Sequence, residues 1–254
     1  MIPVNESIDY LWQMVANHSI YVWGGQGQTG TQVTERWIRR REQDTGGTRI
    51  DGRYRSYADI AVEFWKRQCS LGYGDVLSAF DCSGLFVYFL LNIKHEIRSD
   101  LTAHGLYCLC KKTTERRAGY WVFRLSNGRA SHVGQLVDDN TVIHAKGRAY
   151  GVVAEKYDSG FWHAIGIPPM YDFNDVVPPM PTPEYVKVKG ASTRSVNIRK
   201  GNGKEYKKIA VAHGGDIFPL IGQAVESPKW YNIDYKGNKN AWISSDVKYT
   251  EVIK

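Results

Sequence analysis

Apolar residues recur every three to four positions in the first part of the chain, a spacing typical of helices. It predicts helices over residues 7–15 and 57–68, and a buried helix over residues 80–96, which are apolar on most sides. After Gly119 the pattern changes to short segments rich in β-branched and aromatic residues. These predict strands over residues 120–125, 131–137, 141–145, 151–157 and 161–167. Helices followed by an antiparallel run of strands predict an α+β fold.

A proline-rich stretch interrupts this pattern. Six of the nine prolines lie in residues 167–185. Since proline fixes φ and removes a backbone donor, this stretch predicts an extended linker over residues 168–183. It separates a first domain, 1–167, from a tail, 184–254. The tail has short apolar segments punctuated by Gly, Asn and Pro, which predict a small all-β barrel.

The charge is unevenly placed. The 254 residues are 43% hydrophobic, enough for a sizeable core, and carry a net charge of +7. Most of the excess lies in residues 184–254, with 13 Lys/Arg against 7 Asp/Glu. An anionic partner is therefore expected for the tail, and nucleic acid and an anionic cell-wall polymer both satisfy the charge. Four cysteines in a chain of this length exclude a disulfide framework.

The first twenty residues lack a basic segment followed by an uninterrupted apolar one, so no signal peptide is expected. No stretch approaches transmembrane length, and no membrane partner is expected. The sequence therefore predicts a soluble chain made in the cytoplasm.

Cys82 begins the apolar run "DCSGLFVYFL". Asp81 is a favoured N-cap type, which predicts Cys82 in the first helical turn. There the helix dipole and free N–H groups would stabilise a thiolate and lower the pKa of the thiol. The alternative is a buried thiol that only packs. The nucleophile hypothesis therefore requires a histidine base.

His132 and His144 lie on consecutive predicted strands and are candidates for that role. A three-residue connection over 137–139 would pair the two histidines directly across the strands. A two-residue connection over 139–140 would put their side chains on opposite faces. The catalytic interpretation therefore requires an odd-length connection or a bulge.

The blocks "DCSGL", "SHVG" and "VIHA", with "YVWGG" upstream, resemble the NlpC family of papain-like cysteine peptidases, which cut peptidoglycan stem peptides. The resemblance covers about residues 8–167. It implies a papain-like fold, with Cys82 as nucleophile, His132 as general base and His144 as the orienting residue. It implies no cofactor.

The resemblance also implies that four residues line the substrate site: Tyr21, Trp23, Asp81 and Ser83. Two features depart from the family pattern. About fifty-five residues (26–80) separate "YVWGG" from "DCSG", where the family has a short connection. This insertion is basic and aromatic, and it would either wall the cleft or form a solvated surface loop. The Pro-Gly-Asp turn before the histidine strands is replaced by "RRAGYW".

The tail resembles a bacterial SH3-like cell-wall-binding module in "STRSVNIRKGNG" and "KWYNIDYKGNKNAWISSDVKY". The resemblance implies that it binds the wall. Trp230, Tyr231 and Tyr235 are candidates for an aromatic ligand groove, whereas Trp242 is predicted to lie in the barrel core.

The family resemblance implies a peptidoglycan hydrolase, a cysteine endopeptidase that cuts a stem-peptide amide after D-glutamate. Without a signal peptide, the chain resembles an endolysin. Its partners would be peptidoglycan and anionic wall polymers, reached by phage-type or mobile-element release. A wall-binding protein with a relic peptidase domain is the alternative. No nucleic-acid-binding motif is present. His104, Cys108 and Cys110 match no zinc pattern, so no metal is expected. The oligomeric state stays open.

Overall fold

The computed structural model describes residues 1–174, 184–223 and 230–253. The chain divides into two compact units, residues 1–175 and 176–254. Each is described by itself. Of the predicted linker, residues 175–183 lie outside the described residues. Among the parts described, no helix combines the length and apolar character needed to cross a membrane.

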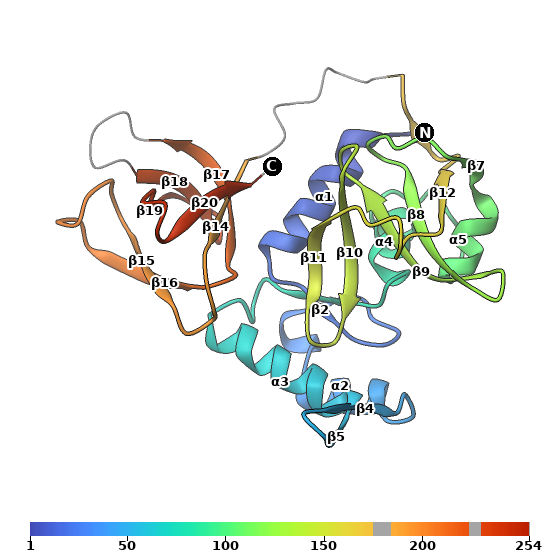
Figure 1. Ribbon diagram of the computed structural model, residues 1–254, viewed down its shortest axis with the longest axis horizontal. Coiled ribbons are helices and arrows are strands. Elements are labelled where there is room, and N and C mark those ends of the chain that lie inside the picture. Colours follow the sequence, from blue (N-terminus) through green and yellow to red (C-terminus); the bar gives the residue numbers. More distant parts are fainter. Residues whose placement is uncertain (175–183, 224–229, 254) are drawn as a thin grey trace. The chain divides into compact units, whose positions relative to one another are not determined.

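The centre of the first unit is a six-stranded antiparallel sheet in the order β11-β10-β9-β8-β12-β7 (Figure 1). The strands are β7 (Lys111–Thr113), β8 (Trp121–Ser126), β9 (Arg129–Leu136), β10 (Thr141–Gly147), β11 (Gly151–Lys156) and β12 (Ala164–Ile167). The five strands predicted between residues 120 and 167 are thus confirmed, with β12 shorter than expected. The edge strand β7 was not predicted, because three residues carry too little pattern.

Five α-helices are found in the described part of this unit: α1 (Val4–Ala16), α2 (Glu35–Glu42), α3 (Tyr57–Ser70), α4 (Gly84–Tyr88) and α5 (Ala103–Leu109). α1 and α3 confirm the first two predicted helices. The third predicted helix starts later than expected, at Gly84, and continues as a π-helical segment, Phe89–Ile93. A 3-10 turn spans Gly30–Gln32.

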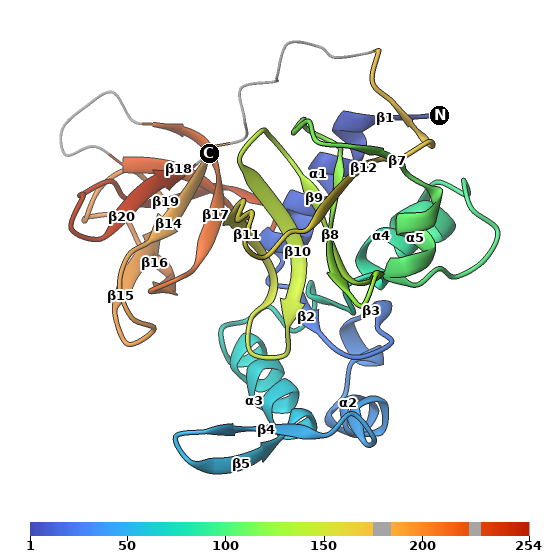
Figure 2. The same ribbon diagram turned by 45° about the vertical axis from the view of Figure 1, so that its right-hand side comes forward.

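Smaller strand pairs complete the first unit: β1 (Ile2–Pro3) with β13 (Tyr171–Asp172), β2 (Ile20–Tyr21) and β3 (Gln26–Thr29) with β6 (Ser78–Phe80), and β4 (Gly47–Ile50) with β5 (Arg53–Ser56). The 26–80 insertion therefore starts with β3 and ends with β6. Between them it contains α2, the β4–β5 hairpin and α3, which gather at the bottom of the view in Figure 2. β13 corrects the predicted linker boundary. Tyr171 is buried and pairs with Ile2, so the first unit extends beyond residue 167.

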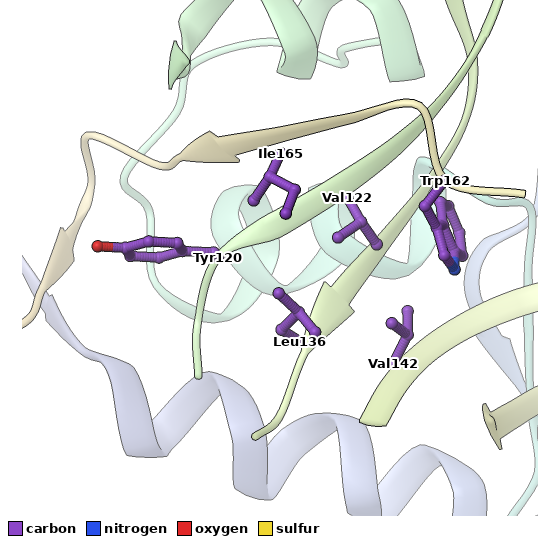
Figure 3. Close-up of a cluster of buried hydrophobic side chains, with 6 residues drawn as sticks. All are labelled: Tyr120, Val122, Leu136, Val142, Trp162 and Ile165. Atoms are coloured by element: carbon purple, nitrogen blue, oxygen red, sulfur yellow. The ribbon is translucent and has the colours of Figure 1, made fainter. Parts of the chain in front are cut away.

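The sheet is packed on both faces. Trp121 on one face lies 5.9 Å, centroid to centroid, from Phe86 of α4, and its indole N–H donates to Gln135. A second cluster of buried side chains lies on the other face of β8, β9 and β10, in contact with β12 (Figure 3). Its members are Tyr120, Val122, Leu136, Val142, Trp162 and Ile165. This cluster shares its face with His132 and His144, since residues two apart on a strand point the same way.

The second unit contains a seven-stranded antiparallel sheet in the order β16-β15-β19-β18-β17-β14-β20. Its strands are β14 (Tyr185–Val188), β15 (Ser195–Arg199), β16 (Lys208–His213), β17 (Ile217–Gln223), β18 (Trp230–Tyr235), β19 (Asn238–Ser244) and β20 (Thr250–Ile253). The predicted all-β character of the tail is confirmed. Closure of this sheet into a barrel stays a prediction.

Candidate active site

Cys82 lies in a tight turn just before α4. The Asp81 side chain holds this turn, because its Oδ1 accepts from the backbone N–H of Ser83 (3.0 Å) and of Gly84 (2.7 Å). Asp81 therefore caps the helix as predicted, but α4 starts two residues after Cys82. Gly84 has no room for a side chain, since a Cβ there would lie 2.0 Å from the Gly25 carbonyl oxygen.

The electrostatic setting of the thiol differs from the prediction. Burial, followed by the negative charge of Asp81, raises the pKa of Cys82 to about 12. The backbone N–H groups of Ser83, Cys82 and Val133 interact with the sulfur and lower its pKa, but they do not outweigh burial. The expectation of a lowered thiol pKa is therefore wrong. A short helix start cannot compensate for the removal of the thiolate from water.

His132 and His144 lie on the same face of the sheet. Val142 pairs with Leu136 across β10 and β9, and the connection between Val137 and Thr141 has three residues. The required odd-length connection is therefore present over residues 138–140, one position after the expected 137–139, which shifts the strand pairing by two residues. His144 consequently lies diagonal to His132 rather than directly opposite. The two rings are joined by a hydrogen bond of 2.7 Å between His132 Nε2 and His144 Nδ1.

A third side chain extends this hydrogen-bonded chain. His144 Nε2 lies 3.0 Å from Glu155 Oε2 on the neighbouring strand β11. The hydrogen bond to His144 contributes most to holding the pKa of Glu155 down, at about 2, so this carboxylate is ionised and only accepts. His144 Nε2 must then carry a proton, which makes Nδ1 the acceptor for His132 Nε2–H. A neutral His132 therefore has its lone pair on Nδ1.

Both imidazoles are held neutral by burial. Desolvation, with the nearby charges of His144 and Arg124, lowers the pKa of His132 to about 3. Desolvation also lowers the pKa of His144, although Glu155 opposes this. Burial thus disfavours an isolated thiolate at Cys82 and an isolated imidazolium at His132.

Aromatic rings fix the orientation of His132. Its ring stacks on Trp162 with the centroids 5.6 Å apart and the planes 17° from parallel. Trp162 belongs to the cluster of Figure 3, so the apolar packing of β8, β9 and β12 determines where the imidazole lies. A cavity of about 630 Å³ borders both histidines, and its walls include Arg124, Glu155 and Phe161.

Cys82 approaches β9 at the residue after His132, where the Val133 N–H contacts the sulfur. Among residues 1–174, no hydrogen bond joins this sulfur to the His132 ring. Catalytic hydrogen bonds are often long before substrate binds. The pairing of Cys82 with His132 therefore stays a prediction.

Three of the four predicted substrate residues surround Cys82. Tyr21 is buried, and its pKa is raised by burial and by the charges of Cys82 and Asp81. Asp81 Oδ2 accepts from Gly24 N–H at 3.0 Å, which ties the "YVWGG" loop to the Cys82 turn. Ser83 Oγ donates to Asp81 Oδ1 at 3.1 Å. The fourth residue, Trp23, is 55% exposed, and no contact of its side chain with Cys82 is found in the described residues.

A buried ion pair from the insertion supports this loop. Glu42, at the end of α2, is 1% exposed and accepts from Trp23 N–H at 2.8 Å through Oε1. Its Oε2 accepts from Arg148 Nε (2.9 Å) and Nη2 (2.8 Å). The Arg148 guanidinium lies over the rings of Tyr57 (4.3 Å) and Tyr21 (5.2 Å). The insertion therefore forms part of the wall beside Tyr21.

In the second unit the structure reverses the roles expected of two tryptophans. Trp230 is only 4% exposed and Trp242 is half-buried. Trp230 therefore belongs to the interior and does not offer a surface ring, which corrects its assignment to a ligand groove. Tyr231 and Tyr235 are half-buried and keep accessible ring surface.

In the parts of the chain that the structure describes, no group of three or more His, Cys, Asp or Glu side chains is placed to hold a metal ion. All four cysteines are free thiols.

Glu155 is the functional candidate that the sequence analysis missed. Val153 pairs with His144, so Glu155, two residues on, must share the face of both histidines. The sequence feature that could have identified it is the glutamate in "GVVAEK" on the next predicted strand, because its position puts it on the same face as the histidines. Glu42 gave no such signal, since its partner Arg148 is 106 positions away.

Comparison with known proteins identifies one region. Residues 69–166 match the NlpC/P60 family, and they include Cys82, His132, His144 and Glu155. This is less than half of the chain, and Tyr21, Trp23 and most of the insertion lie outside it. A search of curated proteins finds no match.

Solved structures resemble the chain only distantly. The P60 domain of antigen MAP1204 from M. avium subspecies paratuberculosis has 16% identity and a TM-score of 0.37, covering 65% of this chain and 96% of its own. The peptidoglycan hydrolase RipB from Mycobacterium tuberculosis also has 16% identity and a TM-score of 0.37, covering 64% of this chain and 65% of its own. Ly7917 with the hydrolyzing product of MDP has 12% identity and a TM-score of 0.25, covering 98% and 97%.

Proposed function

We propose, from the NlpC/P60 region at residues 69–166, that the chain is a peptidoglycan hydrolase. Members of this family are cysteine peptidases that act on peptidoglycan. The proposed reaction is hydrolysis of a stem-peptide amide, the one following D-glutamate, through a thioester on Cys82. The observation that carries the proposal is the hydrogen-bonded chain from Glu155 through His144 to His132, with Cys82 at the adjoining residue.

The first step forms the thioester. His132 Nδ1 takes the Cys82 proton as the sulfur attacks the amide carbon, so neither buried charge forms alone. The N–H groups that contact the sulfur are near enough to stabilise the oxyanion, that of Cys82 foremost. His132 then donates its proton to the leaving amine, and the carbon–nitrogen bond breaks.

The second step releases the acid. His132, again neutral, accepts a proton from water as the water oxygen attacks the thioester carbon. Collapse of the intermediate breaks the carbon–sulfur bond and returns the proton to Cys82. His144 and the Glu155 carboxylate stabilise the transient imidazolium in both steps, because each turns its acceptor toward the next ring.

The second unit is proposed to hold the protein at the bacterial cell wall. Its positive charge suits an anionic wall polymer, and Tyr231 and Tyr235 offer ring surface for a ligand. An SH3-like barrel remains the proposed architecture of this unit.

Product analysis tests the reaction. Purified peptidoglycan is incubated with the wild type, Cys82→Ala and Cys108→Ala, and the released fragments are identified by mass spectrometry. The wild type and Cys108→Ala should release the same fragments, with new amino termini on the residue after D-glutamate. Cys108 is exposed and away from the site, so its removal controls for the loss of a thiol. Release of these fragments by Cys82→Ala would refute the proposal.

A further inference from the structure

A second pocket lies beside the predicted substrate loop, and the insertion builds most of it. It has a volume of about 500 Å³, and its walls include Trp23, Arg40, Arg41, Asp44, Tyr57 and Arg148. Three of these side chains are guanidinium groups and one is a carboxylate. The chemistry of the pocket is therefore that of an anion site with an aromatic wall.

The three arginines differ in how their charge is used. Arg148 is held by the buried Glu42 through Nε and Nη2, so its charge is compensated and its position fixed. Arg40 and Arg41, both exposed, have no carboxylate within ion-pair distance among the described residues. Arg41 lies against the substrate loop, since a Cβ on Gly24 would be 3.4 Å from Arg41 Nη1. Asp44 instead contacts Gln43.

Side-chain contacts connect the pocket to the candidate active site. Arg148 lies over the Tyr21 ring, and Tyr21 in turn interacts with Cys82 and Asp81. Trp23 is two residues after Tyr21, and Glu42 fixes its backbone N–H. A ligand that occupies both the pocket and the candidate active site would therefore pass Tyr21.

Resting on the proposed function, we propose that this pocket binds a carboxylate of the stem peptide that is not part of the scissile amide. Arg40 and Arg41 would hold the carboxylate oxygens, because guanidinium groups match that planar anion. The Trp23 indole, 55% exposed, would cover the adjoining apolar part of the ligand. The insertion would then select substrate rather than only enclose the cleft.

Binding by inert full-length protein tests this separately from hydrolysis. In a Cys82→Ala background, R40Q/R41Q is compared with R36Q/R49Q, which removes two exposed arginines of the same insertion that do not line the pocket. The probes are hydrofluoric-acid-treated peptidoglycan, which lacks wall phosphodiesters, and the same material with its carboxylates amidated. R40Q/R41Q should weaken sedimentation with the first probe by roughly tenfold relative to R36Q/R49Q. The two variants should behave alike on the amidated probe.

Other outcomes overturn the proposal. Equal binding of the two variants to the phosphate-free probe would show that the pocket takes no wall carboxylate. A difference that appears only with walls retaining phosphodiesters would assign the pocket to phosphate. In proteins with Cys82 intact, R40Q/R41Q should raise KM and leave kcat near the wild-type value. If the arginine substitutions weaken binding to the phosphate-free probe as expected but the protein with Cys82 intact releases no fragments, the proposed function is refuted and the anion site is supported.

Discussion

At the scale of single residues, Glu155 determines how the histidines can work. A histidine pair without a fixed end can exchange tautomers, and half of the arrangements would put a proton on the His132 nitrogen needed as base. The Glu155 carboxylate accepts from His144 and removes that ambiguity. It is a positioning residue, acting through His144 rather than on substrate.

Glu155→Ala should therefore lower kcat by about 10- to 100-fold, the range typical when such an orienting partner is lost. Glu155→Gln should recover little, since an amide can donate as well as accept and permits the wrong tautomer. Lys146→Gln is the control, because Lys146 binds the other Glu155 oxygen and leaves the histidine contact intact. Steady-state kinetics with thermal melting separate the effects. A kcat loss that only follows the loss of folded protein would contradict the positioning role.

Part of this site could be predicted from the sequence. Cys82, His132 and His144 were found because short blocks and strand parity carry information about local geometry. The raised pKa of Cys82 was not foreseeable, since it depends on how completely the rest of the fold covers the sulfur. The alternation of side chains along a strand could have suggested Glu155, but its place beside His144 depends on the register of β11 against β10, which the sequence does not give.

At the scale of elements, the β9–β10 hairpin holds two neutral histidines, of which His144 is buried and His132 is half-buried. The pKa of His132 is near 3 in the folded state, against an ordinary value of 6.5. Between pH 3 and pH 6.5, His132 therefore binds a proton in the unfolded chain but not in the folded protein. The stabilisation is complete above pH 6.5 and is lost as the pH falls toward 3.

In urea unfolding of the wild type, the free energy of unfolding should decrease as the pH is lowered from 7 to 4.5. His132→Phe should flatten this slope, because phenylalanine keeps the stacking on Trp162 and does not titrate. The lowered pKa of Glu155 changes the pH dependence of stability only below the ordinary glutamate pKa of 4.5, where its stabilisation is lost as the pH falls. Equal slopes for the two proteins would show that His132 is not buried as described.

The buried ion pair of Glu42 with Arg148 connects α2 to the rest of the first unit. Breaking a buried ion pair leaves its partner uncompensated, so Glu42→Ala should lower the free energy of unfolding by about 3–5 kcal/mol. Glu35→Ala, which removes two exposed ion pairs of the same helix, with Arg39 and with Lys66, should have little effect. Chemical denaturation of both variants measures the difference. Similar losses for both would show that Glu42 does not anchor the insertion.

Sequence predicts elements better than it predicts their partners. Period-two alternation located β8 to β12, and helical spacing located α1 and α3. The burial of Glu42 could not be predicted, because the basic insertion is equally compatible with a solvated surface loop. Its partner Arg148 lies in the turn after β10, 106 positions away. The burial of Trp230 likewise depends on the packing of the second unit, which its sequence segment does not show.

At the scale of the whole molecule, chemistry and charge belong to different units. The candidate active site lies in residues 1–174, whereas the basic excess lies mostly beyond residue 184. Wall attachment and hydrolysis should therefore separate experimentally.

Residues 184–254 alone should sediment with purified cell walls, and the bound fraction should fall as salt rises from 50 to about 500 mM, because screening weakens exposed charge pairs. Walls stripped of anionic polymers should bind less. Salt-independent binding, or equal binding to stripped walls, would contradict electrostatic capture.

The central claim is that Cys82 forms a thioester with the stem peptide. The most direct measurement is acid quenching of the full-length protein during turnover of a soluble stem peptide, followed by mass spectrometry of its peptides. The account predicts an acyl group, with the mass of the fragment ending in D-glutamate, on Cys82 of the wild type and of Cys108→Ala. An acyl group on any other residue, or turnover by Cys82→Ala at the wild-type rate, would contradict it.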